Sequence, residues 1–117
     1  MEPDWIEHRR SNDGERVGWM KPVSEGFVAI DLLGRRRTDV VDWMLAEETL
    51  DELGLGYLAD AHELRLDDGS WLRVRIAEVS SIAIRVKKDD WGDMNATQIY
   101  YTLSFPVTED QLRPLSR

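Results

Sequence analysis

Residues 63–88 read ELRLDDGSWLRVRIAEVSSIAIRVKK, and apolar residues alternate with charged ones along most of this stretch. Successive side chains of a β-strand point to opposite faces, so this alternation predicts strands with one buried and one exposed face. The buried face would collect eight apolar residues, Leu64, Leu66, Leu72, Val74, Ile76, Ile82, Ile84 and Val86. The exposed face would collect five cations and a tryptophan, Arg65, Trp71, Arg73, Arg75, Arg85 and Lys87.

The turns of this stretch are predicted from the same alternation. A two-residue turn at Asp68-Gly69 would set Leu64 opposite Arg73 and bury a cation. A three-residue loop at 67–69, with Gly69 in the left-handed conformation, sets Leu64 opposite Leu72 instead and is preferred.

The second hairpin, by the same reasoning, needs a loop with an odd number of residues at 79–81. Such a loop pairs Ile76 with Ile84 and Val74 with Val86. On the exposed face it sets Arg75 opposite Arg85 and Arg73 opposite Lys87. Like charges that face each other across strands are unfavourable, so some other group is expected to compensate them.

The rest of the chain predicts further strands and one helix. Strands are expected at 5–10 and 15–21, and an Asp13-Gly14 turn between them would put Ile6 and His8 on the face of Val17 and Trp19. A further strand is expected at 26–33 and should be central. Apolar spacing predicts a helix near residues 42–53, with Asp39 as N-cap and Gly54 after its end, although 40–45 could instead be a strand. Residues 55–61 and 97–105 should be extended, the latter with Ile99, Tyr101, Leu103 and Phe105 inward.

These elements indicate an α+β, mainly β fold. We expect about seven antiparallel strands in a bent sheet or small open barrel, with one helix near residues 42–53. At 117 residues, the chain is expected to form a single domain over 1–117.

Composition limits the partners and the compartment. The chain has no cysteine, which excludes disulfides and thiolate metal sites, and no stretch is apolar enough for a membrane span or a signal peptide. We therefore expect a soluble, cytoplasmic protein. The net charge of −8 makes nucleic acid an unfavoured partner. Residues 38–61 hold seven acids and no base, whereas 62–88 hold four acids and six bases.

Candidate catalytic and metal-binding residues are few. His8 and His62 lack a second histidine or a cysteine at ligand spacing, and His62 should lie opposite Val74 as a packing residue. Asp89, Asp90, Asp93 and Asn95 carry hard oxygen ligands, but their spacing does not fit an EF-hand and favours a solvated turn. The sequence thus predicts no catalytic set, no metal site and no cofactor.

The exposed face of the strands is the best candidate for a function. We expect a non-enzymatic binding or protein-interaction domain that self-associates, with Arg65, Trp71, Arg73, Arg75, Arg85 and Lys87 as binding residues. Solvent and nearby acids such as Glu63 and Glu78, or the acidic segment 38–61 of this chain or of a second copy, would compensate the cations. The alternative is single-stranded nucleic acid or another polyanion, and an enzyme or small-ligand pocket comes third. Trp19 and Trp43 are expected in the core, and Trp5, Trp71 and Trp91 at the surface.

Overall fold

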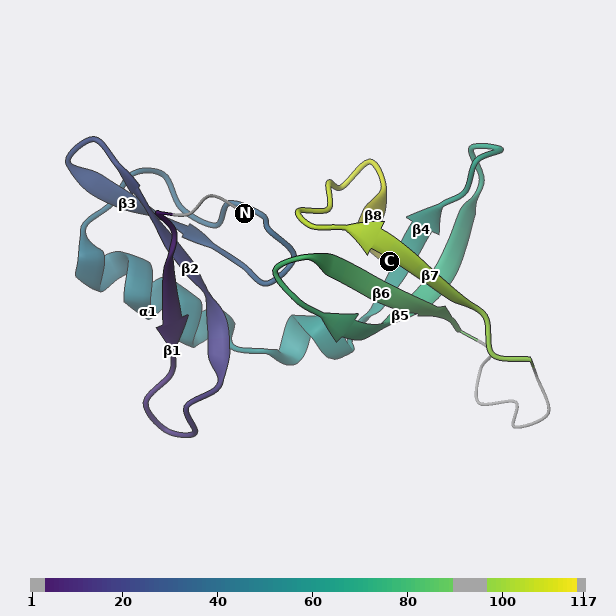
Figure 1. The fold of residues 1–117 in the computed structure, drawn as a ribbon, viewed down its shortest axis with the longest axis horizontal. Helices are drawn as coiled ribbons and strands as arrows, with labels where there is room; N and C mark the ends of the chain where they lie inside the picture. The colour runs from purple at the N-terminus through teal and green to yellow at the C-terminus, as the bar shows by residue number, and fades with distance from the viewer. Residues whose placement is uncertain (1–3, 90–96, 116–117) are drawn as a thin grey trace. The chain divides into compact units, whose positions relative to one another are not determined.

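The computed structural model describes residues 4–89 and 97–115. Within these residues it has eight strands in two separate, open antiparallel sheets, together with one α-helix and one short 3-10 helix, which confirms the predicted mainly β, α+β class. The chain divides into two compact units, residues 1–57 and 58–117, which are described separately below (Figure 1). The expectation of a single domain stays a prediction.

Unit 1 is a three-stranded meander with a helix packed on it. Strands β1 (Ile6–Arg9), β2 (Arg16–Val23) and β3 (Gly26–Ile30) lie in the order β1-β2-β3, and α1 (Trp43–Leu53) packs on β2 and β3 (Figure 1). The apolar core between sheet and helix consists of Val17, Met20, Ala29, Ala46 and Leu50. The predicted N-terminal meander and helix are therefore confirmed.

The register of β1 differs from the prediction. Arg10 and Glu15 pair through their backbones, so the turn has four residues, 11–14, instead of the predicted two. As a result His8 lies opposite Gly18, and Glu7 lies opposite Trp19. The prediction that His8 shares a face with Trp19 is wrong, because it assumed the shortest turn that the Asp13-Gly14 pair allows.

Strand β3 is an edge strand and not the predicted central one. Its free edge is partly covered, because Phe27 and Val41 exchange two backbone hydrogen bonds of 2.7 and 2.8 Å, and Ile30 forms a bridge with Arg36. Those bridges explain its continuous apolar sequence, since most of its side chains are buried although it lies at the edge of the sheet.

Helix α1 begins after Asp42, whose side chain accepts a hydrogen bond from the backbone N–H of Leu45 at 2.8 Å. The predicted N-cap, Asp39, is wrong by three residues because Val41 is held in extended backbone by Phe27. The predicted end is confirmed, since Gly54 is the C-cap, with φ of 59°. Trp43, expected in the core, is 39% exposed and packs edge-on against Phe27, with ring centroids 5.1 Å apart.

Residues 55–61 are not extended as predicted, because η1 (Gly56–Ala59) forms a 3-10 turn there. The Tyr57 hydroxyl accepts a hydrogen bond from the backbone N–H of Leu32 at 3.0 Å. This contact anchors the segment to the loop after β3.

Unit 2 is a five-stranded sheet. The strands are β4 (Ala61–Arg65), β5 (Trp71–Val79), β6 (Ala83–Lys88), β7 (Tyr100–Ser104) and β8 (Leu112–Pro114), in the order β7-β6-β5-β4-β8. Leu64 lies opposite Leu72, and Gly69 has φ of 86°, so the predicted three-residue loop is confirmed. The returning strand β8, which pairs with β4, was not predicted.

The buried face of unit 2 follows the predicted alternation. Leu64, Val74, Ile84, Val86, Leu103 and Leu112 are buried. Ile82 is an exception: it lies at the turn between β5 and β6 and is 81% exposed. Ile99, predicted to point inward, is also exposed. Among the described residues, no helix is long and apolar enough to cross a membrane.

Gly18 is a point of close approach in unit 1. Its φ is 154°, and a Cβ atom added there would lie 2.2 Å from the carbonyl oxygen of Ile30. Because that oxygen belongs to the backbone of β3, a side chain at this position forces β2 and β3 apart.

We predict that Gly18→Ala lowers the free energy of unfolding by about 3 kcal/mol, measured by urea denaturation. Gly56→Ala is the matched control, because an added Cβ there meets nothing within 4 Å. It should change stability by less than about 0.5 kcal/mol. Equal stability of the two variants would contradict the close approach.

Candidate interaction surface

The outer face of the unit 2 sheet carries more cations than acids. The strand register puts every one of the six predicted site residues on this face. We define the basic face by six cations and two aromatic rings: Arg65, Arg73, Arg75, Arg85, Lys87 and Arg113, with Trp71 and Tyr100. Three acids, Glu63, Glu78 and Asp89, lie on the same face among the described residues.

A β-bulge in β5 sets which charges face each other. Ile76 lies opposite Val86 while Glu78 lies opposite Arg85, so Ala77 is the extra residue. The predicted pairing differs from this register by two residues. Because the difference is even, the apolar face is preserved, but the partners on the basic face change.

The predicted like-charge pairs are therefore wrong. Arg85 faces Glu78 instead of Arg75, and the backbone N–H of Asp89 donates to the carbonyl of Arg73 at 3.1 Å, where Lys87 was expected. One like-charge pair remains, between Arg75 and Lys87.

The turn between β5 and β6 explains the shift. Ser80 and Ala83 pair through their backbones at 3.0 Å, so the turn has two residues and not the predicted odd number. The Ser80 hydroxyl oxygen accepts hydrogen bonds from the backbone N–H groups of Ile82 and Ala83, at 3.2 and 3.1 Å. The bulge supplies the odd residue that the alternation requires.

Asp89 neutralises much of the charge of two arginines. One of its carboxylate oxygens accepts from Arg73 Nε at 2.8 Å and from Arg75 Nε at 3.3 Å, and its side chain is only 10% exposed. Arg75 also donates from Nη1 to the carbonyl oxygen of Ala59 at 2.9 Å. The two arginines border a cleft of about 470 Å³ that Asp60 and Leu115 also line.

Two further arginines lie over aromatic rings. The guanidinium carbon of Arg113 is 3.6 Å from the centroid of the Trp71 ring, and that of Arg85 is 4.1 Å from the Tyr100 ring. Arg113 Nε also donates to a carboxylate oxygen of Glu63 at 3.2 Å. Cation–π stacking holds these groups in place without removing their charge from solvent.

Asp89, Arg113 and Tyr100 were missing from the predicted site. Tyr100 could have been found, because it alternates with the inward Tyr101 and Leu103. Arg113 lies on a strand of three residues, too short to give a periodic signal. The involvement of Asp89 depends on the bulge, which the sequence does not reveal.

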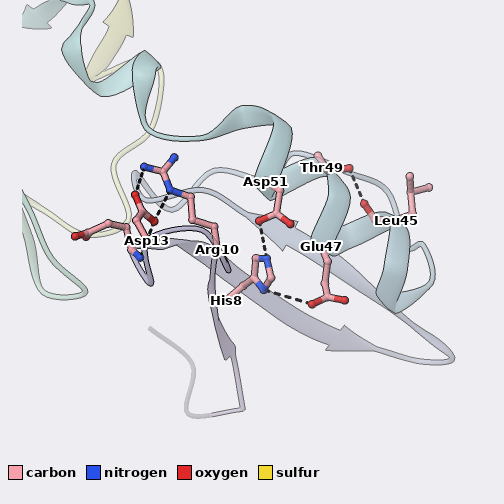
Figure 2. Close-up of polar contacts among 8 residues, drawn as sticks. His8, Arg10, Asp13, Leu45, Glu47, Thr49 and Asp51 are labelled. Carbon is pink, nitrogen blue, oxygen red and sulfur yellow. Dashed lines mark hydrogen bonds and ion pairs between the residues drawn. The ribbon is translucent and has the colours of Figure 1, made fainter.

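His8 forms the second polar cluster, in unit 1. Its Nε2 is 2.9 Å from an Asp51 carboxylate oxygen, and its Nδ1 is 3.6 Å from Glu47. Figure 2 shows both acids, one turn apart on α1, directed toward the buried imidazole. The cluster ties β1 to the helix. His62, 2% exposed, lies opposite Val74 as predicted, and its Nδ1 is 2.9 Å from the carbonyl oxygen of Asp60.

The buried Asp31 organises the loop after β3, which contains Arg35, Arg36 and Arg37. One of its carboxylate oxygens accepts from the backbone N–H groups of Leu33 and Arg35, and the other accepts from Arg37 Nε at 2.7 Å. The Arg37 guanidinium also lies over the ring of Tyr57, at 5.3 Å. Arg37 is thus a structural residue of the loop that follows β3.

Metal-ligating side chains do not gather in the described part of the chain: no group of three His, Asp or Glu residues there is placed to hold an ion. Of the acidic run considered as a cation site, only Asp89 is described, and it binds Arg73 and Arg75. Asp90, Asp93 and Asn95 lie outside the described residues, as does Trp91.

We predict that Asp89→Asn lowers the free energy of unfolding by about 1–2 kcal/mol, because the arginine pair loses its shared carboxylate. Asp67→Asn, in the exposed β4–β5 loop, is the control and should leave stability within about 0.5 kcal/mol. Urea denaturation measures both. The loss should shrink in 1 M NaCl, where the repulsion between Arg73 and Arg75 is screened; a loss as small as that of the control would refute this account.

Tyr57 provides a test by pH. Burial, and then the charge of Asp31, raises the pKa of Tyr57 well above its usual 10.0. The folded chain therefore holds this proton more tightly than the unfolded chain, and its stabilisation is complete below about pH 10 and is lost as pH rises beyond it.

We predict that Tyr57→Phe lowers the free energy of unfolding by about 1–2 kcal/mol at pH 8, because the backbone N–H of Leu32 loses its acceptor. Between pH 10 and 11.5 the wild-type value should fall toward that of the variant. Denaturation curves at several pH values measure the difference. Two parallel pH profiles would show that Tyr57 is not held in its protonated form.

Comparison of the chain with protein-family models, with curated proteins and with solved structures finds no significant match.

Proposed function

We propose that this chain is a non-enzymatic interaction domain that binds an acidic protein surface through the basic face of unit 2. The observation that carries the proposal is the charge of that face, where the described residues place six cations and three acids on a chain whose net charge is −8. A protein that is acidic as a whole gains nothing in solubility from such a face, whereas an acidic partner would gain a complementary surface.

The contacts of the cations support a preformed binding surface. Arg85 and Arg113 are oriented by Tyr100 and Trp71, and Arg73 by Asp89. Side chains that are already ordered lose less conformational entropy when a partner binds. Arg65 and Arg85 are nevertheless exposed, so their charges are available to a partner.

Aromatic stacking favours a protein partner over nucleic acid. Single-stranded nucleic acid is usually bound by bases that stack on exposed rings. An arginine already lies over each of the two rings of the basic face, Trp71 and Tyr100. The net charge of the chain also repels a polyphosphate at long range.

The proposal includes a non-catalytic role and a cytoplasmic location. The imidazole of His8 is occupied by two carboxylates, and His62 is buried in the sheet. A chain without cysteine fits a reducing compartment.

The binding experiment uses two polyanions of similar charge. Fluorescently labelled poly-L-glutamate and a labelled oligo-dT are each titrated with the protein at several salt concentrations, and binding is followed by fluorescence anisotropy. We predict that poly-L-glutamate binds more tightly than oligo-dT. The double variant Arg65→Glu, Arg85→Glu should weaken poly-L-glutamate binding at least tenfold, because two attractions become repulsions.

The control is Lys21→Glu, Arg36→Glu, which changes net charge equally on unit 1 and should change binding less than threefold. Circular dichroism checks that both variants fold. Tighter binding of oligo-dT would contradict the proposal and favour a nucleic-acid partner. An equal loss in both variants would mean that net charge, and not the basic face, controls binding.

A further inference from the structure

We infer that the outer side of helix α1 is a second interaction surface, and that its partner is the basic face of a second copy of this chain. This inference rests on the proposed function, because it uses the same face and names its occupant. The evidence comes from four residues of α1 whose side chains are exposed, Met44, Leu45, Glu48 and Glu52.

The helix has one side packed and another side unpacked. Ala46 and Leu50 are fully buried against the sheet of unit 1, whereas Met44 is 67% exposed and Leu45 47% exposed. Figure 2 shows Leu45 pointing away from the side of the helix on which Glu47 and Asp51 meet His8. Large apolar side chains that gather at the surface in this way commonly mark contact surfaces.

Acidic residues continue this exposed side along the helix. Glu48 follows Met44 by four residues and Glu52 follows Glu48 by four, so the three share one side of α1. Val40 and Trp43, near the N-terminal end of the helix, are also exposed, but Trp43 belongs to the packed side, where it contacts Phe27. We name Met44, Leu45, Glu48 and Glu52 the α1 strip.

The charge of the strip is unsatisfied within its own segment. Residues 38–61 hold seven acids and no base, and the last turn of α1 contains no basic residue. The C-terminal end of a helix carries partial negative charge, so Glu52 lies where an anion is unfavourable and where an external cation would be stabilising. The carboxylates of Glu47 and Asp51 contact the imidazole of His8, whereas Glu48 and Glu52 point outward.

The basic face complements the α1 strip in both charge and apolar character. It offers the exposed cations Arg65 and Arg85 to the carboxylates, and to the apolar side chains it offers the part of Tyr100, 41% exposed, that the Arg85 guanidinium leaves uncovered. Each copy carries one strip and one face, so the strip of one copy can contact the face of another. A second copy is therefore a partner in which every required group is present.

A charge-swap experiment tests the inference. Variant H carries Glu48→Lys, Glu52→Lys and variant F carries Arg65→Glu, Arg85→Glu; sedimentation equilibrium measures the mass of each alone and of their mixture. We expect wild type to exceed the monomer mass of 13.6 kDa, and H and F alone each to associate at least tenfold more weakly. In the mixture the lysines of H meet the glutamates of F, so association should return to within threefold of wild type.

The matched control is Glu15→Lys, Glu25→Lys, which changes net charge as variant H does at exposed acids outside the helix. It should associate as wild type does. Met44→Ser, which alters no charge, should weaken association about threefold to tenfold and serves if either charge variant fails to fold.

Each result decides between the two proposals. Wild type that remains a monomer up to 1 mM, or a mixture of H and F that stays as dissociated as its components, would overturn the inference about the α1 strip. Binding of poly-L-glutamate by wild type, and its loss in variant F, would be unaffected by that failure, so the proposed function would stand. If variant F keeps both its poly-L-glutamate binding and its self-association, the proposed function and the inference about the α1 strip are both overturned.

Discussion

The sheet of unit 2 depends on keeping Leu72, Val74 and Ile76 on the same side of β5 while the turn that follows has an even number of residues. These two demands conflict, because an even turn with regular pairing would move Ile76 and Val74 to the solvent side. The bulge at Ala77 resolves the conflict by leaving one residue unpaired. The buried alternation, the charge pairs and the shape of the basic face all follow from this one adjustment.

Each of the resulting charge pairs contributes little to stability, but together they fix the arrangement of the arginine side chains. Exposed ion pairs stabilise a fold by fractions of about 1 kcal/mol, so Glu63 or Glu78 alone contributes little to folding. Their larger effect is on arrangement, because Asp89 holds two arginines side by side and two rings hold two more. The side chains of the face are thus held in place by contacts within the folded sheet, and a carboxylate lies between two of its arginines.

The sequence predicted the fold class, the helix, the first hairpin loop of unit 2 and the side on which its cations lie. Each of these depends on local periodicity, that is, on the regular spacing of apolar residues such as Leu64 and charged residues such as Arg73. It failed where the outcome depends on contacts that are distant in the chain or on a choice between equivalent signals. Asp39 and Asp42 are equally good N-caps, and only the pairing of Phe27 with Val41 selects between them. The predicted cross-strand partners of Arg73 and Arg85 were wrong because a bulge, unlike a glycine turn, has no plain signature in the sequence.

Because of the bulge, deletion of one residue from β5 and insertion of one residue into it have different consequences for the sheet. If Ala77 were deleted, Glu78 would still lie opposite Arg85 and Ile76 opposite Val86, now in a regular ladder with its alternation intact. Insertion of one more residue would instead demand a second irregularity or expose an apolar side chain. Homologous chains that lack one residue here could therefore share every pairing of this sheet, while longer ones would have to restructure it.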